Sequence, residues 1–239
     1  MKIVFFSDIH GNQYAYQSLL DDMKPLQPDL VVFGGDIFGY YYGQEEIIND
    51  IRKRGYICLL GNHDKMFLDY LEGTVNSDYL IGRYGNSYLN IEHRISDENI
   101  QFIRSLKPEY YLSVDGLHLY FAHGSKYDPL NGRVYPDTDV TDCEEYSGID
   151  FTFLGHTHHQ ILKYTHGCTI INPGSAGQQR DGKGCKYVLF DTSTRTISFK
   201  VIEYDRDSLV GEIERNDSGK MKDKLIEVLY RTANPIKEN

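Results

Sequence analysis

The sequence has little of what marks disulfide scaffolds and membrane proteins. It contains only 4 cysteines, none with Cys-x-x-Cys spacing, so we expect reduced, mostly buried thiols rather than a zinc ribbon or a disulfide framework. No apolar run approaches the ~20 residues that span a bilayer. The apolar run at the N-terminus, Ile3 to Phe6, ends at Ser7 and Asp8. It predicts a strand rather than a signal peptide, and we expect a cytoplasmic protein with no membrane partner.

The sequence also has fewer basic than acidic residues. The chain carries 25 Lys and Arg against 35 Asp and Glu, a net charge of -10. Proteins that bind long nucleic acid by its phosphates usually present a basic face, so we expect a small phosphate ester as the partner instead. Divalent cations can still create a local positive field inside an acidic protein. The length of 239 residues and the hydrophobic content of 40% suit a single domain over residues 1–239.

The first half of the chain alternates between apolar strand and amphipathic helix patterns. We predict strands at 2–7, 30–33 and 56–60, helices at 12–23 and 44–54, and a helix that Ser96 caps and that ends before Pro108. This alternation predicts a parallel sheet with right-handed crossovers. Residues 74–95 show no clear period, and we expect a loop with short helical pieces.

The second half reads as strands joined by tight turns. Hairpins are expected at 111–114 with 117–122 around Asp115-Gly116, and at 161–164 with 168–171 around His166-Gly167, followed by strands at 187–191 and 196–204. A charged helical segment is expected at about 208–232. Two sheets packed face to face with helices outside fit this order, which makes the chain an α/β protein.

Five short motifs collect Asp, Asn and His, each near the end of an apolar run. They are Asp8-Ile9-His10, Gly34-Gly35-Asp36, Gly61-Asn62-His63-Asp64, His123-Gly124 and Gly155-His156-Thr157-His158. Side chains of this mixture suit a pair of small divalent cations. Ligand groups also gather beyond the carboxyl ends of parallel strands, where these motifs fall.

Each motif has a plain structural explanation when taken alone, such as a strand-ending turn or a buried core histidine. The set is harder to explain in that way. In an extended segment Asp8 and His10 point to the same side, as do His156 and His158. The carboxylate of Asp36 can bridge two metals. Asn62 offers a neutral carbonyl ligand, while His63, held by Asp64, can donate a proton to a phosphate oxygen.

With these five motifs in this order, the sequence resembles the calcineurin-like metallophosphoesterase family over residues 1 to about 190. The run Asn172 to Gly182 and the segment Gly34 to Tyr40 resemble its bacterial and archaeal branch of single-domain phosphoesterases. The chain departs from that branch at Lys126, where many members have proline, and in the aromatic run Tyr40 to Tyr42. Both departures bear on the substrate rather than on the chemistry.

The resemblance implies a four-layer α-β-β-α sandwich of two mixed sheets, with the metal site at the carboxyl ends of the strands. It places Asp8, His10, Asp36 and His158 on a first metal, and Asp36, Asn62, His123 and His156 on a second. Asp36 is then the bridge. The resemblance also gives His63 a role in contacting the substrate phosphate and assisting the leaving group, with Asp64 orienting it. Asn62 and Arg180 are also expected to contact the substrate, with a surface salt bridge as the alternative for Arg180.

We therefore expect a phosphodiesterase that uses two divalent metal ions and a metal-bridging hydroxide as nucleophile. Manganese is our first choice, with iron, zinc, nickel and magnesium also compatible with the ligands. Phosphomonoesterase, protein phosphatase or dinucleoside-polyphosphate hydrolase activity is the enzymatic alternative. A metal-bound interaction scaffold without turnover is the alternative of another class, and the pair His63 and Asp64 argues against it. The sequence leaves the oligomeric state open, a homo-oligomer included.

Overall fold

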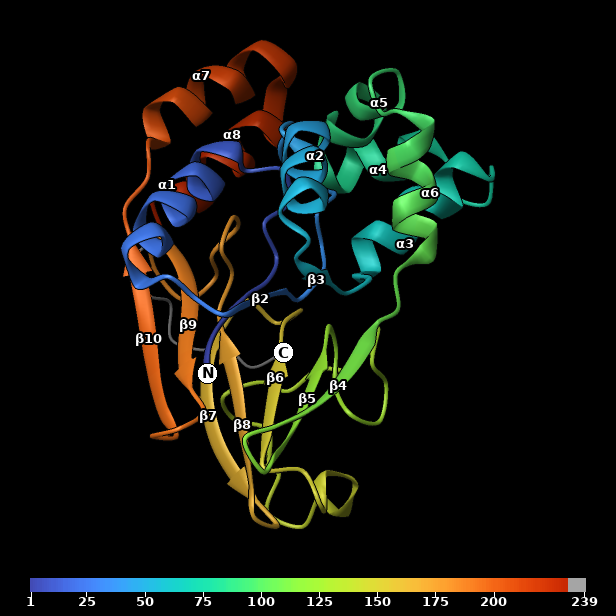
Figure 1. Ribbon diagram of the computed structural model, residues 1–239. Coiled ribbons are helices and arrows are strands. Elements are labelled where there is room, and N and C mark those ends of the chain that lie inside the picture. The colour runs from blue at the N-terminus through green and yellow to red at the C-terminus, as the bar shows by residue number, and fades with distance from the viewer. Residues whose placement is uncertain (232–239) are drawn as a thin grey trace.

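Two five-stranded sheets pack face to face in the computed structural model of the chain, which describes residues 1–231 (Figure 1). The first sheet has the order β10 (Thr196–Ile202), β9 (Cys185–Asp191), β1 (Lys2–Phe6), β2 (Leu30–Phe33) and β3 (Ile57–Cys58). The second has the order β4 (Glu109–Val114), β5 (Leu117–Ala122), β6 (Phe151–Leu154), β8 (Cys168–Pro173) and β7 (Gln160–Thr165). Both sheets combine parallel and antiparallel pairs, so both are mixed.

Strand β1 is apolar throughout because both of its faces are covered. Val4 and Phe6 belong to the core between the first sheet and the helices, whereas Ile3 and Phe5 belong to the core between the two sheets. A strand buried on both sides carries a continuous apolar run rather than an alternating one. β1 pairs with β2 in parallel and with β9 in antiparallel orientation. It is therefore the central strand, and its carboxyl end lies midway along one edge of the sheet.

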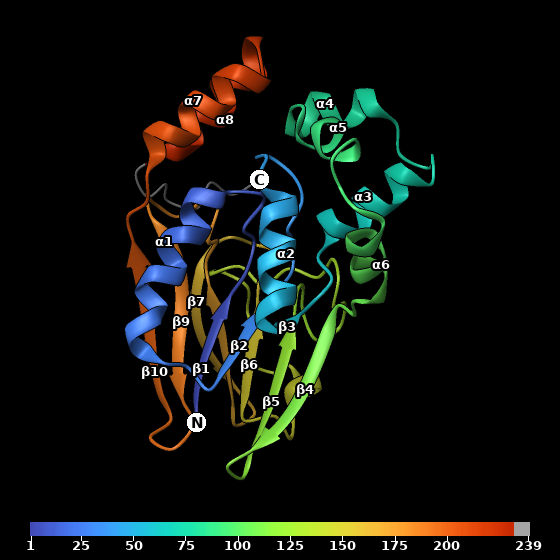
Figure 2. The ribbon, with the colours of Figure 1, turned by 45° about the horizontal axis from the view of Figure 1, so that its top comes forward.

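Helices cover the outer face of the first sheet and one end of the molecule. α1 (Gln13–Met23) and α2 (Gln44–Arg54) lie across the sheet, as Figure 2 shows. The other helices gather toward the carboxyl end of β1: α3 (Asn62–Leu71), α4 (Ser77–Tyr84), α5 (Ser87–Glu92), α6 (Asp97–Ser105), α7 (Arg206–Asn216) and α8 (Gly219–Leu229). The short helices α4 and α5 are the helical pieces expected within 74–95.

The outer face of the second sheet is covered by the segment between β5 and β6. This segment contains the 3₁₀ turn η2 (Glu144–Tyr146) and contributes Val134, Val140 and Tyr146 to a core on that face. The layers are therefore helices, sheet, sheet and this covering segment. The expected α/β class with two mixed sheets is confirmed, and the expected hairpins at Asp115-Gly116 and His166-Gly167 are present.

The charged C-terminal segment forms two helices, α7 and α8, rather than one stretch, and its expected last residue, Thr232, lies outside the described residues. The break falls at Asp217, which is buried. Its carboxylate accepts hydrogen bonds from the hydroxyl of Tyr42 and from the backbone N–H of Asn86. Buried carboxylates need such donors, and these contacts join the C-terminal helices to the segment that follows β2.

Other features agree with the sequence in detail. The side chain of Ser96 accepts a hydrogen bond from the backbone N–H of Asn99 at the start of α6, as a cap does. Strand β3, by contrast, is shorter than the predicted strand 56–60. All 4 cysteines are free thiols. Within residues 1–231, no helix has the length and apolar character to cross a bilayer.

Candidate metal centre

The predicted ligand residues meet at one end of the sheets, where the strands give way to loops. Asp8 and His10 follow β1, Asp36 follows β2, Asn62 begins α3, His123 follows β5, and His156 and His158 follow β6. The carboxyl ends of β1, β2 and β5 point to the same side in Figure 2. All of these side chains are buried except that of Asn62, which is half-buried.

The potential ligand atoms form two adjoining groups. Asp8, His10, Asp36 and His158 make one, and Asp36, His123 and His156 make the other, with the ligand atoms of each group all within 4.8 Å of one another. Asp36 belongs to both. Its Oδ2 lies 3.7 Å from Nε2 of His10 and 3.5 Å from Nε2 of His123. Asn62 adjoins the second group, since its Oδ1 lies 3.0 Å from Nε2 of His123.

The backbone at these residues is not extended. Asp8 and His10 have φ of 59° and 49°, and His156 and His158 have φ of 65° and 60°. The expectation that alternate residues of an extended segment share a side is therefore wrong in its geometry, although both pairs do converge. Left-handed conformations are unfavourable for residues with a Cβ and cluster at functional sites. Asp36 adopts the same conformation, with φ of 64°.

Hydrogen bonds fix which nitrogen of each imidazole faces the centre. Nδ1 of His10 lies 2.7 Å from the carbonyl oxygen of Phe38, and Nδ1 of His158 lies 2.5 Å from that of Gln178. A carbonyl only accepts, so both Nδ1 atoms carry hydrogen and both Nε2 atoms of the neutral rings carry lone pairs. These Nε2 atoms nevertheless lie 3.1 Å apart. Two facing lone pairs repel each other unless a cation lies close to both.

The second group repeats this arrangement. Nδ1 of His123 donates to the carbonyl oxygen of Gly34 at 2.9 Å, so its Nε2 turns a lone pair toward the oxygen atoms of Asn62 and Asp36. His156 supplies a further sign, because its buried Nε2 has no hydrogen-bond partner among the described residues. Buried polar atoms without partners call for an explanation. A bound divalent cation would satisfy each of these nitrogens.

Burial disfavours the protonated forms of His10 and His156. It lowers the pKa of His10 well below the ordinary value, an effect that His158 reinforces. It likewise lowers the pKa of His156 to about 3, with His123 contributing. Burial raises the pKa of Asp36 well above its ordinary value, and Asp64 and Asp8 add to the shift. Neutral imidazoles beside crowded carboxylates are the donor set that divalent cations bind, so the residues present fit a metal.

His63 lies against this centre but donates no atom to either group. Its ring centroid lies 4.9 Å from that of His10, and its backbone N–H donates to Oδ1 of Asp36 at 2.8 Å. Nδ1 of His63 lies 2.7 Å from the hydroxyl oxygen of Tyr88. Gly39 makes room for this ring, because a Cβ at residue 39 would lie 2.5 Å from the same Nδ1.

Asp64 does not orient the ring of His63, contrary to the expectation. Its carboxylate accepts hydrogen bonds from the backbone N–H groups of Asp36, Ile37, Phe38 and Gly61 at 2.7 to 3.2 Å. Four donors use the acceptor sites of both oxygens. Asp64 therefore ties the segment after β2 to the start of α3, and Tyr88, which the sequence did not single out, contacts His63 instead.

The residues around the mouth are aromatic and basic. The ring of Tyr40 packs edge-on against His10, with centroids 4.8 Å apart, and the charge of Arg180 acts on His10, His63 and Asp36. Arg180 is therefore close enough for its charge to act on the centre, while its contact with a phosphate stays a prediction. Lys126 is engaged elsewhere, with its ammonium 5.1 Å and 4.7 Å from the ring centroids of Tyr111 and Tyr120.

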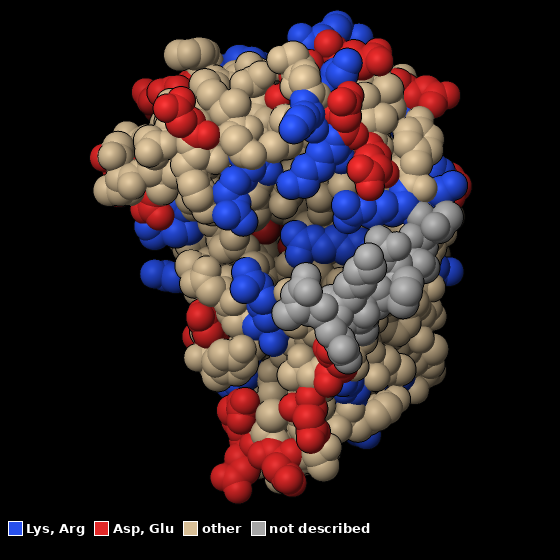
Figure 3. Space-filling model, turned by 180° about the vertical axis from the view of Figure 1, so that it is seen from behind, with Lys and Arg blue, Asp and Glu red and all other residues tan. Residues whose placement is uncertain are grey.

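Charge is unevenly spread over the surface. On the face drawn in Figure 3, Lys and Arg side chains gather across the middle, Lys and Arg mix with Asp and Glu in the upper part, and Asp and Glu cluster at the lower end. The surface therefore has basic regions that an anionic ligand can approach, although the net charge of the chain is -10.

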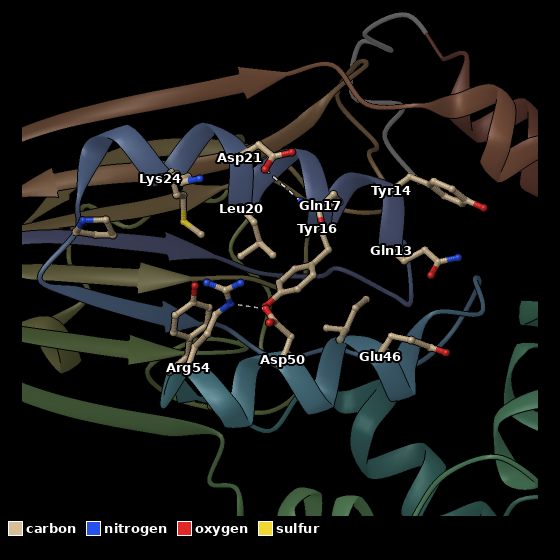
Figure 4. Close-up of a pocket in the computed structure, with 14 residues that line it drawn as sticks. Gln13, Tyr14, Tyr16, Gln17, Leu20, Asp21, Lys24, Glu46, Asp50 and Arg54 are labelled. Carbon is tan, nitrogen blue, oxygen red and sulfur yellow. Dashed lines mark hydrogen bonds and ion pairs between the residues drawn. The ribbon is translucent and has the colours of Figure 1, made fainter.

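A cavity of about 780 Å³ lies apart from the centre, between α1 and α2. In it the hydroxyl of Tyr16 donates to Asp50 at 2.8 Å, and Nε of Arg54 donates to the same carboxylate at 2.5 Å (Figure 4). The hydrogen bonds among Tyr16, Asp50 and Arg54 satisfy these polar groups, so none of the three needs a ligand as a partner.

The family model described as calcineurin-like phosphoesterase superfamily domain matches residues 1–195. An uncharacterized protein from Methanocaldococcus jannaschii is 30% identical over 232 residues, which is 90% of this chain and 92% of that protein.

Two crystal structures share the fold. A metallophosphoesterase from Sphaerobacter thermophilus superposes with a TM-score of 0.77 at 23% identity, over 96% of this chain and 98% of that one. A hypothetical protein from Pyrococcus horikoshii superposes with a TM-score of 0.78 at 18% identity, over 96% of this chain and 97% of that one. At these identities the likeness speaks for the fold alone.

Proposed function

The chain belongs to the calcineurin-like phosphoesterase superfamily, and on that premise we propose that it hydrolyses phosphodiesters with the aid of two divalent cations. The observation that carries the proposal is that several imidazole nitrogens converge with their lone pairs facing one another and without a hydrogen-bond donor between them. Nε2 of His10 faces Nε2 of His158 at 3.1 Å, and Nε2 of His156 has no partner among the described residues. Such an arrangement is costly without cations and favourable with them.

The two groups divide the ligands. Asp8, His10, Asp36 and His158 would hold one cation, and Asp36, Asn62, His123 and His156 the other. The position of the Asp36 carboxylate between His10 and His123 supports its role as the shared ligand. The Nδ1–H groups of His10, His123 and His158 each donate to a backbone carbonyl, which fixes the rings in the orientation that ligation requires.

Bound in this way, the cations would lower the pKa of a water molecule so that hydroxide is available for in-line attack on phosphorus. The chain's own residues would do the rest. His63 would donate a hydrogen bond from Nε2 to a phosphoryl oxygen or to the leaving oxygen, and Arg180 would bind a non-bridging oxygen. Left-handed backbone at Asp8 and Asp36 keeps the carboxylates in place.

The small number of basic side chains near the centre favours a diester. A diester carries one negative charge at neutral pH, whereas a monoester carries nearly two, and few basic side chains act on the centre. The charge of Arg180 acts on His63 and Asp36, and that of Arg133 acts on His156. A scaffold without turnover would gain nothing from a buried histidine that is no ligand, yet His63 lies beside both groups. Manganese suits the mixed Asp, Asn and His set.

The test uses protein stripped of metal by chelation, verified as metal-free and then reloaded separately with manganese, iron, zinc, nickel or magnesium. We expect hydrolysis of bis(p-nitrophenyl) phosphate to vanish on stripping and to return with manganese, at a higher kcat/KM than p-nitrophenyl phosphate shows. Full activity in verified metal-free protein would contradict the metal-dependent mechanism. A higher kcat/KM on the monoester would contradict the preference for diesters.

A further inference from the structure

A groove of about 550 Å³ runs away from Asn62, outside the two ligand groups. One side is formed by α3 and the segment that leads into α4, and the other by residues 130 and 131 of the loop that follows β5. We propose that this groove binds the nucleoside part of the substrate, so that the protein cleaves phosphodiesters of nucleosides. The proposal rests on the proposed function, because it names the substrate class of the same centre.

The groove starts at the second ligand group. Its first wall, α3, begins at Asn62, and its opposite wall belongs to the loop that follows His123 directly. Oδ1 of Asn62 lies 3.0 Å from Nε2 of His123, so the two walls are joined at the position of the proposed cation. A diester whose phosphorus lies at the centre therefore has an ester substituent within reach of the groove.

The loop that forms the second wall is internally braced. The carboxylate of Asp128 accepts hydrogen bonds from the backbone N–H groups of Leu130 and Asn131, at 3.2 Å and 2.9 Å. The backbone N–H of Gly124 donates to the carbonyl of Pro129 at 2.7 Å. The wall is thus held in one shape by its own contacts, which lowers the entropy lost when a ligand binds.

The lining favours a planar ring with a polar edge. Tyr79, Met66, Val75 and Leu130 supply aromatic and apolar surface, and Asn76 and Asn131 supply amides. The charges in the groove cancel, because Lys65 forms an ion pair with Asp69. A nucleobase matches this chemistry, since it is uncharged, stacks on aromatic rings and presents donors and acceptors at its edge. An acidic substituent would find no free charge among these residues.

Tyr79 is the central element of the groove. It is 45% exposed, so its ring is accessible to a ligand in the groove. The guanidinium of Arg83 lies 5.5 Å from its centroid, and Tyr84 packs edge-on at 6.5 Å. Tyr84 in turn packs against His63, with centroids 4.7 Å apart. A row of packed aromatic rings thus connects the proposed catalytic histidine, through the buried Tyr84, to the ring on which a base would stack.

The test compares two diesters with the same leaving group in manganese-loaded protein. Thymidine 5′-(p-nitrophenyl) phosphate carries a nucleoside on the second ester bond, and methyl p-nitrophenyl phosphate does not. We expect wild type to prefer the thymidine ester about 10-fold in kcat/KM. Tyr79→Ala should remove most of this preference by lowering kcat/KM far more on the thymidine ester than on the methyl ester, while Tyr79→Phe should keep it. Tyr164→Ala on β7, at a tyrosine that is 68% exposed and does not line the groove, is the matched control.

An equal loss on both diesters in Tyr79→Ala, or no loss on either, would overturn the proposal. Calorimetry on the same proteins measures the binding of thymidine 5′-monophosphate and of methyl phosphate. These affinities distinguish failure of the groove assignment from failure of the proposed function. If wild type cleaves neither diester, the proposed function fails. The groove assignment then stands if the nucleotide still binds about 10-fold more tightly and loses that advantage in Tyr79→Ala, and it falls if the two ligands bind equally.

Discussion

The hydroxyl oxygen of Tyr88 lies 2.7 Å from Nδ1 of His63, and both side chains are buried. Burial, together with the nearby Asp36, raises the pKa of Tyr88 well above its ordinary value, so the phenol keeps its hydrogen. Its other acceptors are poorer, since the carbonyl oxygen of His63 is 3.4 Å away and Sδ of Met66 is 3.8 Å away. The phenol therefore donates to Nδ1, which leaves the hydrogen of His63 on Nε2.

Tyr88→Phe should lower kcat about 10-fold while KM and metal content stay close to wild type, because the ring remains and only the hydrogen bond that fixes His63 is lost. If Tyr88 acts by positioning His63, the effects of the two substitutions on kcat should not be additive. In a His63→Gln background, Tyr88→Phe should cost nothing further. Tyr84→Phe is the control, since that ring packs on His63 but its hydroxyl does not bond to it. Additive losses in the double variant would argue against the assignment.

His63→Gln should keep both metals, because His63 belongs to neither ligand group, and should slow turnover by ~10²- to 10⁴-fold, as loss of the Nε2–H donor to the leaving oxygen or a phosphoryl oxygen does. The loss should depend on the leaving group. Alkyl esters need a proton as the bond to phosphorus breaks, whereas p-nitrophenolate leaves largely unassisted. Equal losses on alkyl and nitrophenyl esters would instead assign His63 to stabilisation of the phosphoryl oxygens, and unchanged rates on both would revive the scaffold alternative.

Asp36→Asn should reduce the occupancy of both metals, whereas His10→Gln should reduce one, because only Asp36 faces both ligand groups. The amide can still accept the hydrogen bond from the backbone N–H of His63, so the change removes charge more than structure. Metal analysis of the purified variants is the measurement. Loss of a single ion in Asp36→Asn, with the other retained in full, would remove the bridging assignment.

Asp64→Asn should destabilise the fold by roughly 3 kcal/mol, because an amide NH₂ would replace an oxygen that accepts from backbone N–H groups in a buried site. Chemical denaturation of the metal-free proteins gives the free energy of unfolding. Asp69→Asn lies on the same helix and breaks only the ion pair with Lys65 near the surface, so it should cost at most about 1 kcal/mol. Similar losses in the two variants would show that the bonds to Asp64 contribute little.

Much of the fold follows from the sequence because its elements repeat simple patterns. The apolar run of β1 and the turn signal at Asp115-Gly116 are local features, and both predict the observed elements. Helix α3 was not predicted, because the motif Gly61 to Asp64 reads as a turn until the backbone bonds to Asp64 are seen. Strand β6 was also missed, since its apolar residues 151–154 are few.

The candidate centre was foreseen as a set of residues but not in its geometry. The positive φ angles of Asp8 and His156 depend on hydrogen bonds between segments far apart in the sequence, such as the bond from the backbone N–H of His156 to the carboxylate of Asp8. The contact of Tyr88 with His63 joins two helices across a stretch without periodicity. A tyrosine in such a stretch carries no local signal of its partner, so only the packed structure reveals it.

Anomalous diffraction from crystals of manganese-loaded protein, recorded at the manganese absorption edge, tests the central claim most directly. Two peaks are predicted. One should lie among Asp8, His10, Asp36 and His158, and the other among Asp36, Asn62, His123 and His156, with the Asp36 carboxylate between them. A single peak at full occupancy, or peaks outside these residues, would contradict the two-cation centre on which the proposed hydrolysis depends.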